Sequence, residues 1–208
     1  MPEPHLRTVT RTQGNNAALK NGSIKPRGLV FDFVEVPVLV QAFRRMVREL
    51  EFDVCEMAFT TYLAARAHGV PFTALPIFLV REFHHDAIEF NTTLGIREPK
   101  DLQGCRVGLP RGYTVTTGVW ARGVLAEQYG VDLDRVTWVC GGDEHVSQFH
   151  APNNVVSMPP GADLSQMLIN GEIAATVGMH TDHPAVARLI PDAEHAGLQA
   201  LRRTGHYP

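Results

Sequence analysis

The chain has 208 residues, of which 44% are hydrophobic, so it can bury a core as one large domain or two small ones. Its net charge is −3 with acidic and basic residues interspersed, which excludes both a nucleic-acid-binding basic stripe and a membrane-binding Lys/Arg cluster. The first residues lack a charged segment followed by an apolar run, and no apolar stretch is long enough to span a bilayer. We expect a cytoplasmic protein that binds small molecules or other copies of itself.

The first third of the chain alternates predicted strands and helices. A strand is expected near Leu6–Val9, and the polar residues 11–16 after it form either a ligand-facing loop or an ordinary turn. Leu29–Val36 alternates apolar and polar residues as a half-buried strand does, and Pro37 then opens a helix. The buried face of that helix follows from the helical spacing of Val40, Phe43, Val47 and Leu50.

A second strand-to-helix junction follows. Phe52–Met57 is predicted to be a strand, and Thr60 or Thr61 to begin a helix that ends near Gly69. The first turn of a helix leaves backbone N–H groups without intrahelical partners and carries partial positive charge. This junction is therefore a candidate anion site.

Two further strands are expected over residues 73–80 and 81–91, and residues 92–99 are typical of a hinge. His84 and His85 are consecutive in the second of these strands. Because consecutive side chains of a strand point to opposite faces, at most one of the two histidines lines a pocket. A histidine in a strand is otherwise most often structural.

Residues 101–123 are the most informative stretch for function. Arg106–Leu109 is predicted to be a strand, Pro110 and Gly112 break the pattern, and a helix then runs to Gly130. Thr114, Thr116 or Thr117 can cap that helix, and together with Arg111 they make its first turn a second candidate anion site. The alternative is that these threonines only cap the helix.

The last third of the chain predicts a strand over Val136–Cys140, a helix capped by Asp163, and a last strand after Gly171. His180, Asp182 and His183 have a spacing that a metal could use, but no separated third ligand accompanies them. Asp182 is better explained as the cap of a helix that begins at Pro184.

The three cysteines, Cys55, Cys105 and Cys140, are odd in number and far apart in the sequence. Each lies among apolar residues of a strand-like segment, where a thiol packs as a small hydrophobic group. The sequence therefore predicts buried free thiols.

Residues 101–131, DLQGCRVGLPRGYTVTTGVWARGVLAEQYGV, resemble the start of the second lobe in proteins with the type 2 periplasmic-binding-protein fold. In that fold such a strand leads to a helix whose N-terminus faces the ligand. The resemblance is closest to the 4,5-dihydroxyphthalate decarboxylase family, through Trp120, Arg122, Gly123, Tyr129-Gly130-Val131, Trp138, Gly141-Gly142 and Glu144.

The resemblance implies an α/β, two-lobed fold with residues 1–92 in the first lobe, 93–178 in the second, and 179–208 starting a return to the first. Thr204-Gly205-His206-Tyr207-Pro208 resembles the family's T-G-x-x-P segment, after which relatives continue. It therefore also implies a first lobe that lacks its C-terminal closing segment.

Site residues follow from the same resemblance. Residues 52–66, FDVCEMAFTTYLAAR, resemble a family segment that implies Glu56 and Thr60 as pocket residues. Arg81 and His85 stand where the family has Arg and His.

Two departures leave the substrate open. The family's Asp-Tyr-Asp-Arg pattern is absent from residues 11–16, and Ala174 stands where relatives usually have Asp.

The activity implied is cofactor-independent decarboxylation of a hydroxylated aromatic dicarboxylic acid such as 4,5-dihydroxyphthalate. Arg81 with Thr116 and Thr117 would hold the carboxylate that stays. His85 would protonate the ring carbon, and Glu56 would polarise the phenol. The other expected substrate-binding residues are Thr60, Thr61, Arg111, Thr114 and Arg122.

Neither a Walker loop nor a dinucleotide-binding G-x-G-x-x-G is present, so no organic cofactor is implied, and a divalent metal is an open alternative without sequence support. The competing interpretation is a solute-binding protein of an ABC-type transporter that captures a small organic anion without catalysis, because a fold does not fix a function. A third is an inactive short chain whose cleft stays open.

Overall fold

The computed structural model describes residues 2–208, which form two compact units. Unit 1 consists of the residues up to Leu79 and of His145–Phe149, and unit 2 consists of Val80–Glu144 and His150–Pro208. The chain therefore leaves unit 1, returns to it briefly, and leaves it again.

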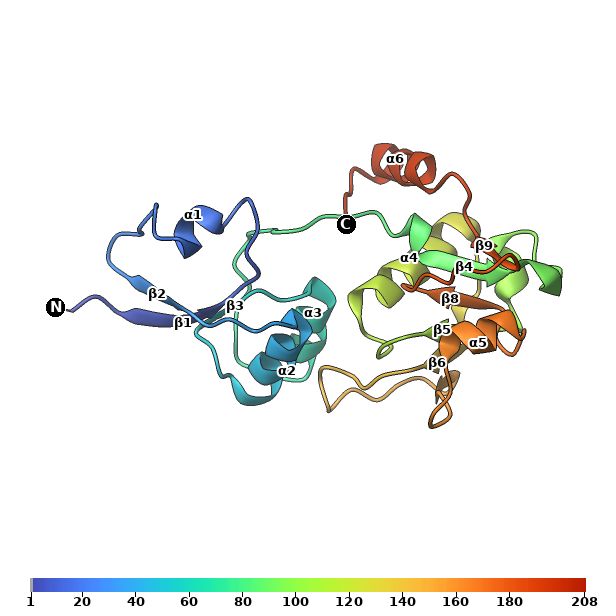
Figure 1. Cartoon of the computed structure of the whole chain (residues 1–208), viewed down its shortest axis with the longest axis horizontal. Coiled ribbons are helices and arrows are strands. Elements are labelled where there is room, and N and C mark those ends of the chain that lie inside the picture. Colours follow the sequence, from blue (N-terminus) through green and yellow to red (C-terminus); the bar gives the residue numbers. More distant parts are fainter. Residues whose placement is uncertain (1) are drawn as a thin grey trace. The chain divides into compact units, whose positions relative to one another are not determined.

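Unit 1 is built on a small parallel sheet with the strand order β2-β1-β3 (Figure 1). Its strands are β1 (His5–Val9), β2 (Val30–Phe33) and β3 (Val54–Cys55), and its helices are α1 (Ala17–Lys20), α2 (Leu39–Glu49) and α3 (Phe59–Ala67). The three strands and two longer helices predicted for this part of the chain are confirmed, although α3 begins after Ala58 and not at a capping threonine.

The core of unit 1 lies between α2 and the sheet. The buried residues of α2 are Leu39, Ala42, Phe43, Met46 and Val47, and most of them share one apolar cluster with Val9 and Phe52. Leu50, which was expected on this buried face, instead ends α2 in a left-handed conformation (φ 52°) with its side chain 44% exposed. Its backbone N–H bonds the Met46 carbonyl and so closes the last turn.

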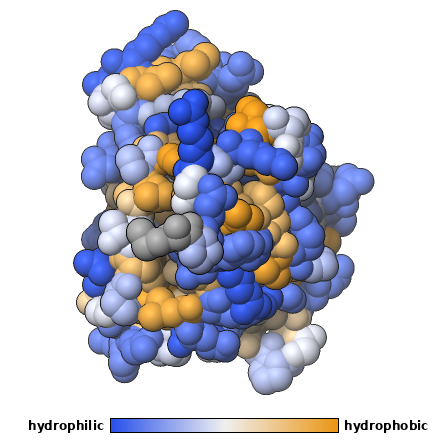
Figure 2. Space-filling model, turned by 90° about the vertical axis from the view of Figure 1, so that its left-hand side faces the viewer, coloured by the Kyte–Doolittle hydropathy of each residue, from blue (hydrophilic) through white to orange (hydrophobic). Residues whose placement is uncertain are grey.

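The strand predicted over residues 73–80 is wrong. Its apolar residues have strand propensity, but no neighbouring strand pairs with this segment, and strand formation depends on such pairing. Leu75, Ile77 and Phe78 are each more than 60% exposed. Figure 2 shows one face of the molecule, on which apolar side chains gather in separate groups between hydrophilic ones.

Unit 2 contains a mixed sheet with the strand order β7-β6-β5-β8-β4-β9 (Figure 1). Its strands are β4 (Ile88–Asn91), β5 (Arg106–Leu109), β6 (Thr137–Cys140), β7 (Val155–Ser157), β8 (Ala175–Val177) and β9 (Val186–Arg188). Its helices are α4 (Thr116–Tyr129), α5 (Leu164–Ile169) and α6 (Ala193–Thr204), with short 3-10 turns η1 (His85–Ala87), η2 (Thr92–Leu94), η3 (Pro99–Leu102) and η4 (Leu133–Arg135). β4 runs antiparallel to both of its neighbours, whereas β5, β6, β7 and β8 are parallel.

Helices α4 and α5 cover opposite faces of this sheet. Val107 and Leu109 of β5 share a buried cluster with Leu125 of α4. Gly108 between them faces the other way, and a Cβ at that position would lie 2.9 Å from Leu164 of α5. Successive residues of β5 thus face α4 on one side of the sheet and α5 on the other.

Several predicted helix ends in unit 2 are confirmed. Gly130 ends α4 in a left-handed conformation, and the Asp163 carboxylate accepts the Gln166 backbone N–H at 2.9 Å to cap α5. The N-cap of α4 is Val115 and not one of the threonines.

Two other predictions for unit 2 are wrong. Of residues 81–91 only the last four form a strand, and His85–Ala87 is a 3-10 turn. No helix begins at Pro184, because the chain there enters β9, which pairs with β4 through Glu89 and Arg188. Pairing between distant segments overrides the local capping signal.

All three cysteines are free, as predicted, but each is half-buried and not fully buried. Among residues 2–208, no helix combines the length and the apolar character that crossing a membrane requires.

Candidate functional site

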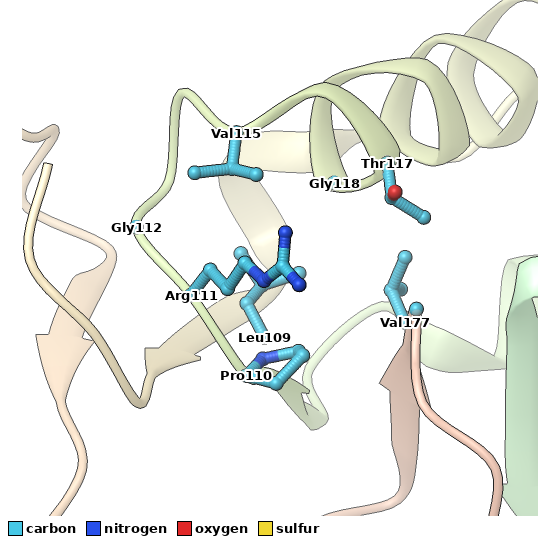
Figure 3. Close-up of a pocket in the computed structure, with 9 residues that line it drawn as sticks. Leu109, Pro110, Arg111, Gly112, Val115, Thr117, Gly118 and Val177 are labelled. Carbon is cyan, nitrogen blue, oxygen red and sulfur yellow. The ribbon is translucent and has the colours of Figure 1, made fainter. Parts of the chain in front are cut away.

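A pocket lies in unit 2 where the carboxyl end of β5 meets the first turn of α4 (Figure 3). We call it the Arg111 pocket; its volume is about 90 Å³, and it is lined by Leu109, Pro110, Arg111, Gly112, Val115, Thr117, Gly118, Val177 and Gly178. In Figure 3 the Arg111 guanidinium extends into the space between Val115 and Val177, and Thr117 borders the same space. The structure thus brings together two of the predicted substrate-binding residues.

The Arg111 pocket is electrostatically suited to an anion. Arg111 supplies a full positive charge, and the first turn of the 14-residue helix α4 adds unpaired backbone N–H groups and partial positive charge. Thr116 is the first residue of that helix, and Thr117 contributes a hydroxyl group. No acidic side chain of the described residues lines the pocket. Its chemistry fits a carboxylate.

Close packing keeps the Arg111 pocket narrow. A Cβ at Gly178 would lie 2.9 Å from the Thr117 methyl group, so only glycine lets the end of β8 approach α4 this closely. An engineered cavity of about 150 Å³ binds benzene, so a pocket of 90 Å³ has room for a carboxylate but not for an aromatic ring as well. A ring attached to a bound carboxylate would lie outside the pocket.

Glu144, which lies beyond the end of β6, fixes the loop between β5 and α4. Its carboxylate accepts hydrogen bonds from the backbone N–H of Tyr113, from the backbone N–H of Thr114 at 3.1 Å, and from the Thr114 hydroxyl. Gly112 permits this approach, because a Cβ there would lie 2.8 Å from the Glu144 carboxyl group. Thr114, a predicted substrate-binding residue, is therefore bonded to a carboxylate of its own chain.

Arg122 supports the same loop from within unit 2. It is 6% exposed, its Nη2 donates to the Tyr113 carbonyl at 2.7 Å, and its guanidinium lies 3.6 Å from the centre of the Tyr113 ring. Burial lowers the pKa of Arg122 from its usual range. Arg122 does not line the Arg111 pocket, and the structure places it as a support for Tyr113.

His85 lies in η1, between the sheet and α4. It is 2% exposed, and its Nε2 donates to Gln128 Oε1 of α4 at 2.9 Å, while its Nδ1 is buried without a partner among the described residues. The predicted general acid is therefore enclosed by its own unit, where it holds α4 against η1.

Arg81 lies four residues before His85, in the segment that leads into η1. Its Nη1 donates to the Tyr207 carbonyl at 2.6 Å, and the neighbouring Glu82 N–H bonds the Pro208 carbonyl at 2.9 Å. Arg81 is not among the residues that line the Arg111 pocket.

The other three predicted residues lie in unit 1, where Glu56 binds the loop that follows β1. Its side chain is 8% exposed and accepts hydrogen bonds from the Thr10 hydroxyl at 2.6 Å and the Arg11 backbone N–H at 2.9 Å. The Arg11 guanidinium adds two contacts, at 3.1 and 3.2 Å, and the Gln13 amide two more, at 3.3 and 3.4 Å. Glu56 thus organises the polar loop that was predicted to be either a ligand-facing loop or an ordinary turn.

Thr60 and Thr61 lie in the first turn of α3 and are both buried. The Thr61 hydroxyl is bonded to Nδ1 of His145 at 2.8 Å, and His145 is itself 2% exposed. Thr61 is thus engaged by the short segment that returns to unit 1.

The sequence did not identify Glu89 and His180 as a pair. Nδ1 of His180 lies 2.6 Å from a Glu89 oxygen, although 91 residues separate them. The available signal was Glu89 itself, a carboxylate at a buried position of an apolar strand. No group of three or more potential metal ligands forms anywhere in residues 2–208.

No protein-family model matches the chain. The 4,5-dihydroxyphthalate decarboxylase of Pseudomonas putida is 34% identical over 176 residues, which cover 78% of this chain and 68% of the relative. The 4,5-dihydroxyphthalate decarboxylase of Comamonas testosteroni is 32% identical over 182 residues, which cover 81% of this chain and 55% of the relative. The chain thus spans between about half and two thirds of the length of these curated relatives.

Among solved structures, the periplasmic aliphatic sulphonate-binding protein SsuA of Escherichia coli aligns with a TM-score of 0.52 at 15% identity, covering 91% of this chain and 60% of that one. This likeness shows the fold alone, and it agrees with the α/β type 2 periplasmic-binding-protein fold that the sequence predicted. Together with the extended identity to two curated decarboxylases, it shows that the chain belongs to the 4,5-dihydroxyphthalate decarboxylase family.

Proposed function

We propose that the protein catalyses the cofactor-independent decarboxylation of a hydroxylated aromatic dicarboxylic acid such as 4,5-dihydroxyphthalate. The observation that carries this proposal is the identity of 32–34% to two decarboxylases over about four fifths of the chain. The Arg111 pocket supports it, because a dicarboxylic acid needs a site that holds one carboxylate while the other is lost.

The reaction needs a clamp and an acid. Protonation of the ring carbon that bears the departing carboxylate interrupts aromaticity, and loss of CO₂ restores it. The carboxylate that stays must be held so that the ring is oriented toward the acid. In our scheme Arg111, the Thr117 hydroxyl and the first turn of α4 form this clamp in unit 2.

The residues around the clamp would hold Arg111 and the first turn of α4 in position. Glu144 and Arg122 fix the loop that carries Arg111, and His85 attaches α4 to η1. Such support matters because a binding group displaced by about 1 Å can lower a rate by about 100-fold. In unit 1, Glu56 would have the same role for the loop after β1.

The test is to incubate the purified protein with a panel of hydroxylated aromatic diacids and to measure CO₂ release. Arg111→Ala should lower kcat/KM by about 10- to 100-fold, because hydrogen bonds to charged groups contribute about 1.5–3 kcal/mol. Arg106→Ala is the matched control, since Arg106 is exposed at the opposite end of the same strand. Equal activity of both variants would contradict the role of the pocket.

The competing function is capture of a small organic anion without catalysis, which the fold would equally serve. A thermal shift with a diacid, without CO₂ release from any member of the panel, would favour it. CO₂ release that depends on the protein would exclude it.

A further inference from the structure

A buried carboxylate of β4 and an exposed imidazole of the loop after β8 form a pair in unit 2. Glu89 of β4 is 5% exposed, and its carboxylate contacts Nδ1 of His180 at 2.6 Å and accepts the Thr181 backbone N–H at 2.8 Å. The His180 side chain, by contrast, is 81% exposed. We call these two residues the Glu89–His180 pair.

This geometry fixes the chemical state of the two ring nitrogens. A carboxylate oxygen can only accept, so Nδ1 of His180 carries the proton of the hydrogen bond. Nε2 is then the nitrogen that is left to exchange protons with a ligand. A carboxylate that orients an imidazole and stabilises its protonated form is a recurrent element of acid–base catalysis.

Anchoring of the loop does not by itself account for the pair. Burying a carboxylate is unfavourable unless it is well paired, and exposed ion pairs contribute only about 0–1 kcal/mol. The Thr181 N–H alone would anchor this loop to Glu89. The contact between Glu89 and Nδ1 additionally fixes the orientation of the His180 ring, which projects into solvent.

His180 lies in the loop that begins at the carboxyl end of β8, and this loop starts at the Arg111 pocket. Gly178 lines that pocket, and His180 is two residues further along the same loop. An extended chain spans at most about 3.6 Å per residue, so the two Cα atoms are within about 7 Å of each other. Met179 between them lines a neighbouring cavity of about 210 Å³ that also contacts Pro110.

We propose that His180, oriented by Glu89, is the proton donor of the decarboxylation; this inference rests on the proposed function. With one carboxylate in the narrow Arg111 pocket, the aromatic ring lies outside it, and His180 lies on the loop that continues from Gly178 of the pocket lining. His85 cannot take this role without rearrangement, because it is 2% exposed and its Nε2 is bonded to Gln128.

The proton transfer balances without a cofactor. The Nε2–H bond of protonated His180 breaks as a C–H bond forms at the ring carbon that bears the departing carboxylate. The bond between that carbon and the carboxylate then breaks, its electron pair returns to the ring, and CO₂ leaves. Neutral His180 regains a proton from water, and the hydrogen bond between Nδ1 and Glu89 is kept throughout.

The chain offers a matched control in His183 of the same loop. Its Nδ1 accepts the Ala185 backbone N–H at 3.2 Å, and none of the described carboxylates forms an ion pair with it. His180→Gln should lower kcat by about 100-fold or more, with KM changed less than threefold. His183→Gln should keep the activity of the unchanged protein. If His180→Gln keeps kcat within threefold, the inference is wrong.

Glu89 is a positioning residue in this scheme. Glu89→Gln should lower kcat by about tenfold or more and should shift the neutral His180 ring away from the Nδ1–H tautomer, which ¹⁵N NMR of labelled histidine reports directly. A merely structural role would let the tautomer change while kcat stayed the same, so the two changes must appear together. His180→Gln changes an exposed side chain, so that variant remains informative even if Glu89→Gln folds poorly.

A further readout separates this inference from the proposed function. Phthalate lacks the hydroxyl groups that this reaction needs, so it can bind without turnover. Saturating phthalate should shift the ¹⁵N signals of His180 and leave those of His183 in place. Unmoved His180 signals with phthalate bound would overturn the role of His180 and leave the proposed function standing. Shifted signals without CO₂ release from any diacid would overturn the proposed function and reduce His180 to a ligand contact.

Discussion

At the scale of single residues, two glutamates each fix a loop that follows a strand. Glu56 bonds the Arg11 backbone N–H in unit 1, and Glu144 bonds the backbone N–H of Thr114 in unit 2. Each glutamate thus satisfies donors that would otherwise need water or a ligand. The loops are shaped before a ligand arrives, which reduces the entropy that binding must overcome.

The half-buried thiols give a residue-scale prediction about reactivity. Burial raises the pKa of Cys55 to about 12 and that of Cys140 to about 11, and raises the pKa of the less buried Cys105 by a smaller amount. Each unit of pKa lowers the thiolate fraction tenfold, and the thiolate is the reactive form. Iodoacetamide at pH 8 should therefore modify Cys105 first, which peptide mass spectrometry of the folded protein can follow. Modification of Cys55 at the rate of a free thiol would contradict the structure.

Sequence reasoning reached the candidate site only in part at this scale. Arg111 and Thr117 were identified because a strand, a Pro-Gly break and a helix follow one another locally, and the structure places both at one pocket. The Glu89–His180 pair depends on β4 and β8 lying side by side, which no local pattern encodes. His85 was selected by resemblance, and its burial depends on packing against Gln128.

At the scale of elements, α6 packs against the segment before β4 through a glycine. A Cβ at Gly197 would lie 2.6 Å from the Phe83 ring, closer than real Cβ contacts allow. Gly123 in α4 is helical as well, but a Cβ added there would meet nothing within 4 Å. The two helical glycines therefore differ in the space around them and not in their secondary structure.

This difference predicts opposite effects of the same substitution. Gly197→Ala should lower the free energy of unfolding by about 1–3 kcal/mol, because the side chain overpacks against Phe83. Gly123→Ala should raise it by up to about 1 kcal/mol, because alanine is the better helix former. Urea denaturation of both variants measures the two changes. Equal effects would mean that α6 does not contact Phe83 as described.

Elements whose signals are local were predictable, and elements that need a partner were not. Asp163 caps α5 and Gly130 ends α4 because each acts within its own turn. Residues 73–80 carry apolar residues of strand type, yet no strand pairs with them. β9 was missed because its existence depends on pairing with β4.

At the scale of the whole molecule, the chain contributes to unit 1 from two separate places. Val146, from the short return segment, is 1% exposed and packs in a cluster with Val47, Ala65 and Val70 of unit 1. Val156, on β7 of unit 2, is 37% exposed. Val146 is therefore a core residue of unit 1, whereas Val156 is a surface residue of unit 2.

Val146→Ala should lower the stability of unit 1 by about 2 kcal/mol, through lost burial and the cavity that remains. Hydrogen exchange should rise in α2 and α3 and stay unchanged in β5 and β6 of unit 2. Val156→Ala is the control and should change neither unit by more than about 0.5 kcal/mol. Uniformly faster exchange in the Val146 variant would show that the two units unfold as one.

Residues His145–Phe149, which return to unit 1, also determine how unit 1 can be produced on its own. A fragment that stops at Leu79 would carry every strand and helix of unit 1 but would leave the Thr61 hydroxyl facing a void where His145 belongs. Joining residues 145–149 to such a fragment by a short flexible linker restores His145 and Val146 to the interior of unit 1. Isolating unit 1 requires a gene that joins residues 1–79 to residues 145–149, because a truncation after Leu79 discards part of its interior.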